Sequence, residues 1–239
     1  ESMRVDFVAN VSHELRTPLA TLHGFIETLR GPARDDLEAH ERFLEIMEQQ
    51  TSRMTRLVTD LLSLSRIETA EHTAPNEEIE LRPLAEHLTA ATEMTAARQG
   101  IKVALDIDPA LPPLIANSDE ISQVLQNLLE NALKYGRDQS VVTIHAKMAK
   151  DLPASLSLQA HHLVAISVSD QGDGIPREHI PRLTERFYRV DTARSRELGG
   201  TGLGLAIVKH IVSRHRGALT IDSKVGEGST FTVYIPCKA

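Results

Sequence analysis

Hydrophobic residues recur every seven positions along the first thirty residues of the chain. The repeat has two interleaved series: Val8, Leu15, Leu22 and Leu29, and Val11, Pro18 and Phe25. This spacing is typical of a helix that packs in a coiled-coil manner. Gly31 and Pro32 follow the repeat and interrupt helices, so the pattern predicts a first helix that ends near residue 30.

A second helical pattern follows this break. Its apolar residues are Phe43, Met47, Met54, Leu57, Leu61 and Leu64. The two helices are expected to form a helical hairpin. Further apolar residues, which two helices alone cannot cover, are Leu19, Ile26, Val58 and Leu62. We therefore predict a homodimer in which two hairpins form a four-helix bundle.

The pattern changes after residue 70. Five runs rich in β-branched residues, at 101–107, 141–148, 163–170, 218–223 and 229–236, alternate with helical segments. Such alternation indicates a second domain built from a sheet and helices, and an α+β fold for the whole chain. The expected boundaries are 1–70 for the helical domain, 71–79 for a linker and 80–239 for the second domain.

Composition narrows the class of function. The formal net charge of −7 over 239 residues argues against binding nucleic acid, which needs a clustered positive surface. The single cysteine, Cys237, excludes an intrachain disulfide and suits a reducing compartment such as the cytoplasm. No run approaches the ~20 apolar residues of a membrane helix. Because the helical pattern is already under way at Glu1, we expect a C-terminal portion of a longer protein.

The first helix contains the stretch FVANVSHELRTPL, residues 7–19. In the heptad, His13 falls on the side away from the seam, so its ring is expected to face solvent, with Arg16 and Thr17 beside it on the same face. Glu14 is adjacent in sequence only. Pro18 cannot donate to the carbonyl of Glu14 and is expected to loosen or kink the helix. An exposed histidine can equally be plain polar surface, so this stretch alone leaves its role open.

The second domain contains a helical segment, NLLENALKY, with a polar face. Asn127, Asn131, Lys134 and Tyr135 share that face at helical spacing. Neutral amide oxygens suit a hard cation such as Mg²⁺ that is already bound to phosphates, and a lysine offers those phosphates a positive charge. An ordinary amphipathic helix would show the same pattern.

A strand then leads into SVSDQGDGIP. Its Asp170 can accept a hydrogen bond from an exocyclic amine, and the bare backbone of Gly172 and Gly174 would let a flat ring approach closely. A glycine-rich turn with a surface aspartate is the alternative.

Two further glycine motifs follow. In GGTGLGLAIVKHIV, Gly200, Gly202 and Gly204 lead into a helix whose free N–H groups can bind an anion. This stretch follows an arginine-rich loop and no strand, so a dinucleotide fingerprint is excluded by its context. The last motif, VGEGSTFTVYIP, is a glycine turn into a strand and is compatible with a simple hairpin.

Taken in order, these motifs resemble those of sensor histidine kinases of two-component systems over nearly the whole chain. His13 lies in what looks like the H box, Asn131 in the N box, Asp170 to Gly174 in the G1 box, ERFYR in the F box and Gly200 to Gly204 in the G2 box. The segments HIPRLTERFYRVD and ARSR are most similar to the corresponding segments of the phosphate-starvation sensor kinases. The F box departs from the family at Thr184, where an apolar residue is usual.

The resemblance implies a dimeric phosphotransfer hairpin followed by a Bergerat-type α/β sandwich that binds ATP and Mg²⁺, with residues between Ile175 and Gly199 as a mobile lid. His13 would accept the γ-phosphoryl group and pass it to an aspartate of a response regulator. Glu14 would be the general base, Thr17 would orient water for dephosphorylation of the regulator, and Asn131 would hold Mg²⁺. The implied nucleotide contacts are Asn127, Asn131, Lys134, Tyr135, Asp170, Gly172, Gly174, Arg189, Gly200, Thr201, Gly202, Leu203, Gly204 and Thr230.

Two other functions compete with this interpretation. Chaperone, gyrase and mismatch-repair ATPases share the Bergerat pocket, but they carry a water-activating glutamate four residues before the metal-binding asparagine, where this chain has Asn127. The other alternative is an inactive dimeric scaffold that sequesters a regulator, and the intact His13, Asn131 and G2 glycines argue against it. The resemblance further implies a full-length protein anchored in a bacterial inner membrane through a region outside this sequence.

Overall fold

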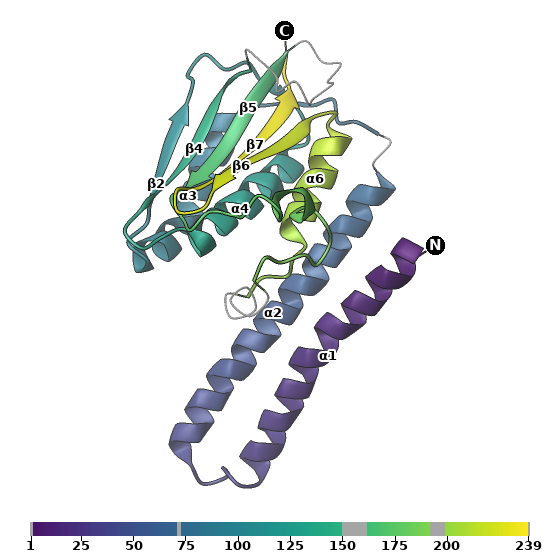
Figure 1. Ribbon diagram of the computed structural model, residues 1–239, viewed down its shortest axis with the longest axis vertical. Helices are drawn as coiled ribbons and strands as arrows, with labels where there is room; N and C mark the ends of the chain where they lie inside the picture. Colours follow the sequence, from purple (N-terminus) through teal and green to yellow (C-terminus); the bar gives the residue numbers. More distant parts are fainter. Residues whose placement is uncertain (1, 71–72, 150–161, 192–198, 239) are drawn as a thin grey trace. The chain divides into compact units, whose positions relative to one another are not determined.

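The computed structural model describes residues 2–70, 73–149, 162–191 and 199–238 (Figure 1). These residues form two compact units. The hairpin unit comprises residues 1–62 and 186–203, and the sheet unit comprises residues 63–185 and 204–239. The boundary at residue 62 falls inside a continuous helix, so the two units are joined there by helical backbone. Within the described ranges no helix is both long enough and apolar enough to cross a membrane.

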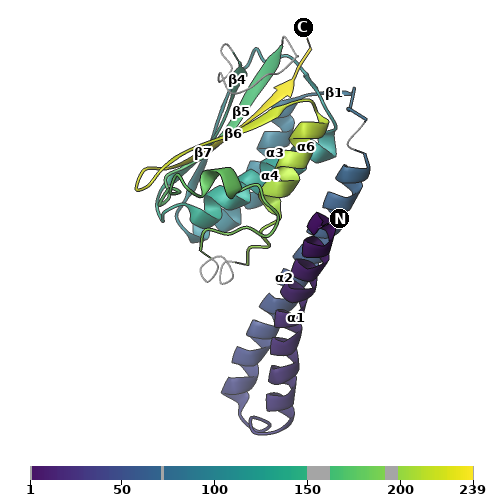
Figure 2. The same ribbon diagram turned by 45° about the vertical axis from the view of Figure 1, so that its right-hand side comes forward.

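The hairpin unit is built on two antiparallel helices, α1 (Ser2–Arg30) and α2 (Leu37–Thr69), which lie side by side in Figures 1 and 2. The turn between them is closed by Ala33, whose N–H donates to the Thr28 carbonyl at 3.0 Å. Asp36 caps α2, because its carboxylate accepts the N–H of Ala39 at 3.0 Å. The predicted helical hairpin is therefore present.

Helix α1 continues without interruption through Pro18. Proline has no N–H for the Glu14 carbonyl, so one bond of the helical ladder is missing here. One residue earlier, the hydroxyl of Thr17 donates to the carbonyl of His13 at 3.3 Å. The side chain of Pro18 is buried, so this residue packs as part of the seam that the heptad predicts, and the helix does not break at it.

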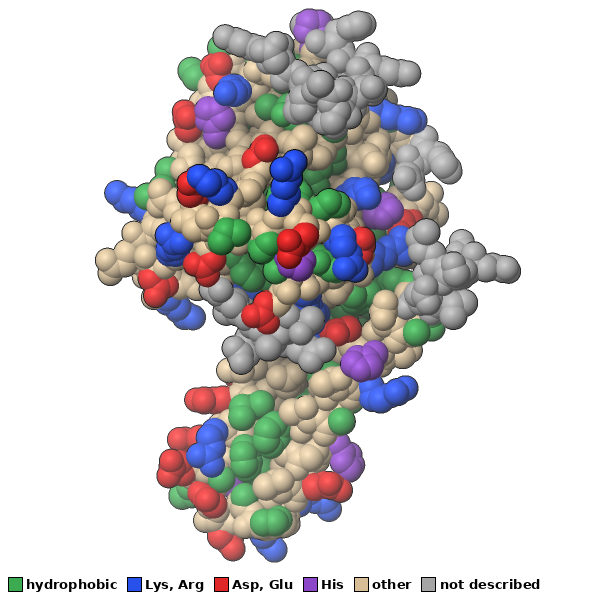
Figure 3. Space-filling view, in the orientation of Figure 1, with side chains coloured by type: hydrophobic (Ala, Val, Ile, Leu, Met, Phe, Trp, Pro, Cys, Tyr) green, Lys and Arg blue, Asp and Glu red, His purple; other side chains and the backbone are tan. Residues whose placement is uncertain are grey.

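Several apolar side chains of the hairpin remain uncovered by its own chain. The four residues that the sequence places outside the hairpin core are exposed: Leu19 (51%), Ile26 (43%), Val58 (45%) and Leu62 (56%). Hydrophobic side chains gather on the face of the hairpin seen in Figure 3. Val8 was expected in the seam, but it is 62% exposed. Exposed apolar side chains on a helix pair are typical of a pair that packs against a second one.

The sheet unit has a five-stranded sheet in the order β2-β4-β5-β7-β6. Its strands are β2 (Lys102–Ile107), β4 (Val141–Met148), β5 (Leu163–Asp170), β6 (Ala218–Lys224) and β7 (Gly228–Pro236). Strand β2 pairs parallel to β4, and the other neighbours are antiparallel. A separate two-stranded sheet joins β1 (Glu78–Ile79) to β3 (Leu114–Ile115). All five predicted strand runs are confirmed as strands.

Three helices cover one face of the large sheet, as Figure 2 shows: α3 (Leu81–Arg98), α4 (Ser118–Tyr135) and α6 (Gly204–Arg214). Alternate residues of β4 and β5 are buried beneath them, including Ile144 and Ile166, which are fully buried. The two-layer arrangement follows from strands that alternate and helices that are apolar on one side. The α+β fold class is confirmed.

The end of α2 is held by α6. Arg214, in the last turn of α6, donates from Nε to the carbonyls of Ala70 and Thr73, both at 3.1 Å, and it also pairs with Glu120 of α4. His210, one turn earlier on α6, lies 3.6 Å from the carboxylate of Glu68. The last turn of α2 is therefore tied to α6 within the sheet unit.

His215 is buried directly after α6, and its ring connects two helices. Its Nε2 accepts the N–H of Asn117, the N-cap residue of α4, at 3.1 Å, and its Nδ1 lies 2.8 Å from the carbonyl of Ile211. These bonds require a neutral ring with the proton on Nδ1. Burial lowers the pKa of His215, although the Ile211 carbonyl and Glu120 oppose this shift.

We expect the free energy of unfolding to fall as the pH drops below about 6.5. The unfolded chain then binds a proton at position 215 that the folded chain resists, so the contribution of neutral His215 is complete above the unfolded pKa and is lost as the pH falls toward the lowered folded pKa. The loss is at most about 1.4 kcal/mol per pH unit. Urea unfolding between pH 8 and pH 5 should show a flatter profile for His215→Gln, which keeps an acceptor for Asn117. The exposed His23→Gln is the matched control, and an unchanged slope for His215→Gln would contradict the assignment.

Candidate functional site

The polar face of α4 supplies the first part of the site. Asn127, Asn131 and Lys134 are half-buried and Tyr135 is exposed, while Leu128 and Leu129 on the opposite side are fully buried. The helix is set by Asn117 at its start, whose side chain accepts the N–H of Glu120 at 3.1 Å. The amphipathic pattern therefore leaves the three predicted polar side chains on the less buried side of α4, away from the core.

The G1 turn packs tightly against α4 and against strand β6. A Cβ atom at Gly172 would lie 2.2 Å from the carbonyl oxygen of Tyr135, and one at Gly174, where φ is +69°, would lie 2.1 Å from the carbonyl oxygen of Lys224. Both spaces are thus filled by backbone of the protein itself. From the sequence, the missing side chains were interpreted as room for a flat ring of a ligand. In the structure, these two glycines allow segments of the protein's own backbone to pack closely.

Asp170 ends β5 and is buried at 8% exposure. Its Oδ1 accepts the N–H of Gly172 at 2.8 Å. Burial raises the pKa of the Asp170 carboxyl, and hydrogen bonds from the N–H groups of Gly172 and Ser229 partly offset that rise. A buried carboxyl held in this way can form a directional hydrogen bond with an amine of a ligand.

Ser229, and not Thr230, shares the side of the sheet on which Asp170 lies. Asp170 pairs in register with Ser229, whereas the hydroxyl of Thr230 lies 2.9 Å from that of Ser169. Because side chains alternate along a strand, Thr230 points to the face that the helices do not cover. The prediction that Thr230 joins Asp170 in nucleotide binding is not supported by this placement, and strand alternation in GSTFTV was the signal that could have favoured Ser229.

The G2 glycines fall on both sides of the start of α6. Gly204 begins that helix in the sheet unit, and a Cβ atom there would lie 3.0 Å from Oδ1 of Asn127, so its small size lets α6 approach α4. In the hairpin unit, Gly202 has a φ of +74° and its carbonyl accepts the N–H of Phe187 at 2.8 Å. Thr201 donates to Asp60 at 2.7 Å, and its hydroxyl accepts the N–H of Leu203 at 3.3 Å.

The hairpin unit contains the H-box residues. His13 and Thr17 are exposed on α1, as predicted, whereas the carboxylate of Glu14 is only 13% exposed. Glu14 Oε2 accepts from Arg53 of α2 at 2.6 Å and from Arg189 at 3.0 Å. Sequence reasoning missed Arg53, which is one polar residue among many on α2 and lies 39 positions from Glu14. The predicted phosphate ligand Arg189 here contacts a carboxylate.

The predicted site residues divide between the two units. His13, Glu14, Thr17, Arg189 and Gly200 to Leu203 belong to the hairpin unit, and the others belong to the sheet unit. Of the predicted lid, residues 192–198, which include Arg194 and Arg196, lie outside the described residues. The first part of the lid packs within the sheet unit, where Leu183 is buried and the N–H of Ile175 donates to Ser223 at 2.8 Å.

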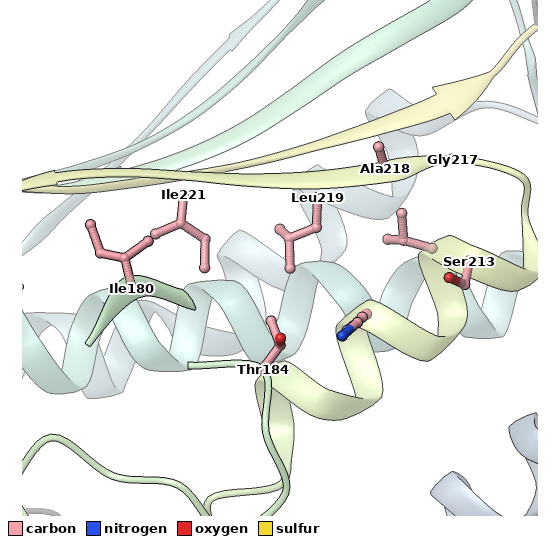
Figure 4. A pocket seen from close by; sticks show the side chains of 9 residues that line it. Ile180, Thr184, Ser213, Gly217, Ala218, Leu219 and Ile221 are labelled. Carbon is pink, nitrogen blue, oxygen red and sulfur yellow. The ribbon is translucent and has the colours of Figure 1, made fainter. Parts of the chain in front are cut away.

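A cavity of about 310 Å³ lies beside this first part of the lid (Figure 4). It is lined by Ile180 of the short helix η1 (Ile180–Arg182), by Thr184, by α6 residues and by β6 residues such as Leu219 and Ile221. None of its lining residues is a predicted nucleotide contact. Thr184, at which the F box departs from the family pattern, faces this cavity, so the departure affects packing between the lid and α6.

The donor set on α4 fits a magnesium ion that is already bound to phosphates. The described residues contain no cluster of three or more histidine, cysteine or acidic side chains that could hold a metal by themselves. Asn131 offers a neutral amide oxygen, an oxygen ligand of the kind Mg²⁺ prefers. Such an ion usually keeps several ligands from substrate phosphates, so one protein amide is a sufficient contribution.

Known families match both parts of the chain. The His Kinase A (phospho-acceptor) domain matches residues 3–70, and the histidine kinase-, DNA gyrase B-, and HSP90-like ATPase family matches residues 116–239. The phosphate regulon sensor protein PhoR of Pseudomonas aeruginosa is 42% identical over 234 residues, which cover 98% of this chain and 50% of PhoR. The sensor histidine kinase WalK of Bacillus subtilis is 39% identical over 98% of this chain and 37% of WalK.

Solved structures show the same fold. The histidine kinase AdeS of Acinetobacter baumannii aligns with a TM-score of 0.70 and 24% identity over 95% of this chain and 98% of that chain. The histidine kinase ThkA, solved in complex with the response regulator protein TrrA, aligns with a TM-score of 0.75 and 23% identity over 99% of this chain and 63% of that chain.

The chain thus combines a phospho-acceptor hairpin with a nucleotide-binding domain of the ATPase family, in that order. It belongs to the sensor histidine kinases. The resemblance to sensor histidine kinases is thereby confirmed, and the phospho-acceptor domain implies a dimer. The chain spans half or less of the length of the two curated relatives named above.

Proposed function

We propose that this chain transfers the γ-phosphoryl group of ATP to His13 and then to an aspartate of a response regulator. The observation that carries the proposal is the exposure of His13 on α1 in a domain of the phospho-acceptor family. A neutral imidazole is nucleophilic near pH 7, and the phosphoramidate that it forms passes its phosphoryl group on readily. Asn131, Lys134 and Asp170 would bind the nucleotide, and Mg²⁺ held at Asn131 would neutralise phosphate charge.

Hydrolysis of ATP as the main activity is not favoured by α4. The conformational ATPases carry a glutamate four residues before the metal-binding asparagine, and Asn127 occupies that position. The amide of Asn127 cannot act as a general base for water. Its side chain instead lies against Gly204, at the start of α6.

Incubation of the chain with γ-labelled ATP and Mg²⁺ tests the proposal. A histidine kinase gives protein label that acid removes, a conformational ATPase gives free phosphate without protein label, and a scaffold gives neither. We expect the first result. Protein that releases phosphate but carries no acid-labile label would overturn the proposal.

The response regulator is proposed as both the acceptor and a phosphatase substrate. The structural relative ThkA was solved with the response regulator TrrA, which supports a regulator as the partner. The exposed hydroxyl of Thr17 lies one helical turn from His13 and can orient a water molecule, because its bond to the His13 carbonyl uses only its proton. From the family resemblance we further propose that the chain acts in the cytoplasm as part of a membrane-anchored sensor.

Replacement of Thr17 by alanine should separate the two activities. We expect phosphorylation of His13 to stay within a few-fold of wild type, because the nucleotide contacts lie on other residues. Dephosphorylation of the regulator should fall by at least about tenfold, since an attacking water loses its orienting hydrogen bond. The measurement is the decay of purified phosphorylated regulator in the presence of ADP.

Thr21→Ala is the matched control, because Thr21 bonds to the carbonyl four residues back in the same way, at 3.1 Å. It should retain wild-type decay. Equal acceleration of decay by Thr17→Ala and wild type would show that Thr17 has no part in dephosphorylation. If wild type does not accelerate decay, the chain is a kinase only.

A further inference from the structure

Glu14 points into the hairpin while its neighbours on α1 point outward. His13, Arg16 and Thr17 are exposed, but the Glu14 side chain is only 13% exposed. A carboxylate that is withdrawn from water to this extent must be compensated by hydrogen bonds or by positive charge. The groups that compensate Glu14 therefore control where its carboxylate can lie.

Two arginines compensate it, and both donate to the same oxygen. Arg53 Nη2 lies 2.6 Å from Oε2 of Glu14, and Arg189 Nη2 lies 3.0 Å from it. Arg53 belongs to α2, which the turn at Gly31 connects covalently to α1, and its side chain is 12% exposed. Its contact with Glu14 is thus made inside the hairpin, between two helices.

Arg189 is a different kind of partner. Its Nη2 also donates to the carbonyl of Thr201 at 3.0 Å, within the segment that carries the G2 glycines. Its Nε is buried and has no hydrogen-bond partner among the described residues. A buried donor without a partner costs about 1–3 kcal/mol. This arrangement leaves Arg189 with an unmet bonding capacity that phosphate oxygens can satisfy.

We propose that Arg53 is a positioning residue for phosphorylation of His13. It fixes the carboxylate of Glu14, the residue that follows His13 in the chain, while Arg189 exchanges between Glu14 and the nucleotide phosphates. This inference rests on the proposed function. It adds a residue of α2 to the reaction centre that neither the H box nor the nucleotide motifs contain.

The two carboxylate oxygens of Glu14 then have different roles in the reaction. Arg53 stays protonated and holds Oε2, so Oε1 is the oxygen that accepts the Nδ1 proton of His13. As that proton moves, Nε2 of His13 forms a bond to the γ-phosphorus, and the bond from this phosphorus to the bridging oxygen of ADP breaks. Without Arg53, the position of the carboxylate would depend on Arg189, which is needed at the phosphates at the same moment.

The test measures autophosphorylation kinetics of Arg53→Met and Arg53→Lys in the whole chain. We expect kcat to fall by about tenfold or more in Arg53→Met, with the KM for ATP within about twofold of wild type, because transition-state positioning is lost and nucleotide binding is not. Arg53→Lys, which keeps the charge, should recover part of kcat. Arg66→Met is the matched control, since Arg66 is an exposed arginine on the same helix.

A double-mutant cycle separates positioning from structural support. If Arg53 acts through Glu14, Arg53→Met combined with Glu14→Gln should be no slower than Glu14→Gln alone. Additive losses, or a kcat of Arg53→Met equal to that of wild type, would overturn the inference. If Arg53→Met fails to fold, the comparison is made with Arg53→Gln and Arg53→Lys, and equal wild-type kcat for both would overturn it.

The failure of this inference differs from the failure of the proposed function. If wild-type protein is labelled at His13 but the losses in the double-mutant cycle are additive, only the role of Arg53 is contradicted. Wild-type protein that carries no label at His13 removes the proposed function, and with it the reaction that Arg53 would support.

Discussion

Replacement of His13 by alanine is expected to abolish transfer of label from ATP to the chain, while the affinity for ATP stays within about twofold. His13 is exposed on α1, so its removal creates no cavity and should leave the free energy of unfolding nearly unchanged. The nucleotide contacts on α4 belong to the sheet unit and His13 belongs to the hairpin unit. Filter assays for acid-labile label, together with binding of a fluorescent ATP analogue, measure both quantities.

His23→Ala is the control for this experiment. His23 lies on the same helix, its side chain is 75% exposed, and it is paired only with Glu27 four residues on, at 3.6 Å, among the described residues. It should retain full labelling. Stable label on His13→Ala would assign the phosphoryl group to another residue and contradict the H-box interpretation.

Replacement of Asn131 by alanine should remove the Mg²⁺-dependent part of ATP binding, with a loss of affinity of at least about tenfold. The amide is a proposed metal ligand, so the loss should disappear when wild type and variant are compared in EDTA. Alanine is a better helix former than asparagine, and the half-buried Asn131 contributes little core volume, so the fold should persist. Calorimetric titration with and without Mg²⁺ gives both affinities.

Gln126→Ala provides the comparison on the same helix. Gln126 is exposed and donates to Glu130 at 2.9 Å, so it can lose its side chain without touching the polar face of α4. Its Mg²⁺-dependent affinity should match wild type. If Asn131→Ala also matches wild type, the N-box resemblance describes a structural helix face and the metal is held elsewhere.

The strands and the long helices could be predicted because their patterns are local. In β4 and β5 every second residue is buried, and this period of two is visible in VVTIHAKM and LVAISVSD. The heptad of α1 similarly places Pro18 in the seam, where it is buried, and leaves Leu19 and Ile26 outside the hairpin core, where the single chain leaves them exposed. In each case one element decides the outcome, so the sequence of that element is sufficient.

The contacts of the site could not be predicted, because they join residues that no local pattern relates. The sequence relates Glu14 to His13 only by adjacency, whereas the position of its carboxylate depends on Arg53 and Arg189. The packing of Gly172 depends on the position of the Tyr135 carbonyl, at the end of α4 and before strands β4 and β5 in the chain. The family resemblance indicates which residues belong to the site. The contacts that these residues make can be learned only from the folded structure.

The bonds from Arg214 fix the end of α2 to α6 within the sheet unit. Residues up to 62 and residues from 63 onward belong to different units, yet they share one unbroken helix. A helix transmits twist along its axis, because each turn is bonded to the next. Within the sheet unit, a displacement of the last turn of α2 would therefore act on α6 through the guanidinium of Arg214 and the carbonyl of Ala70.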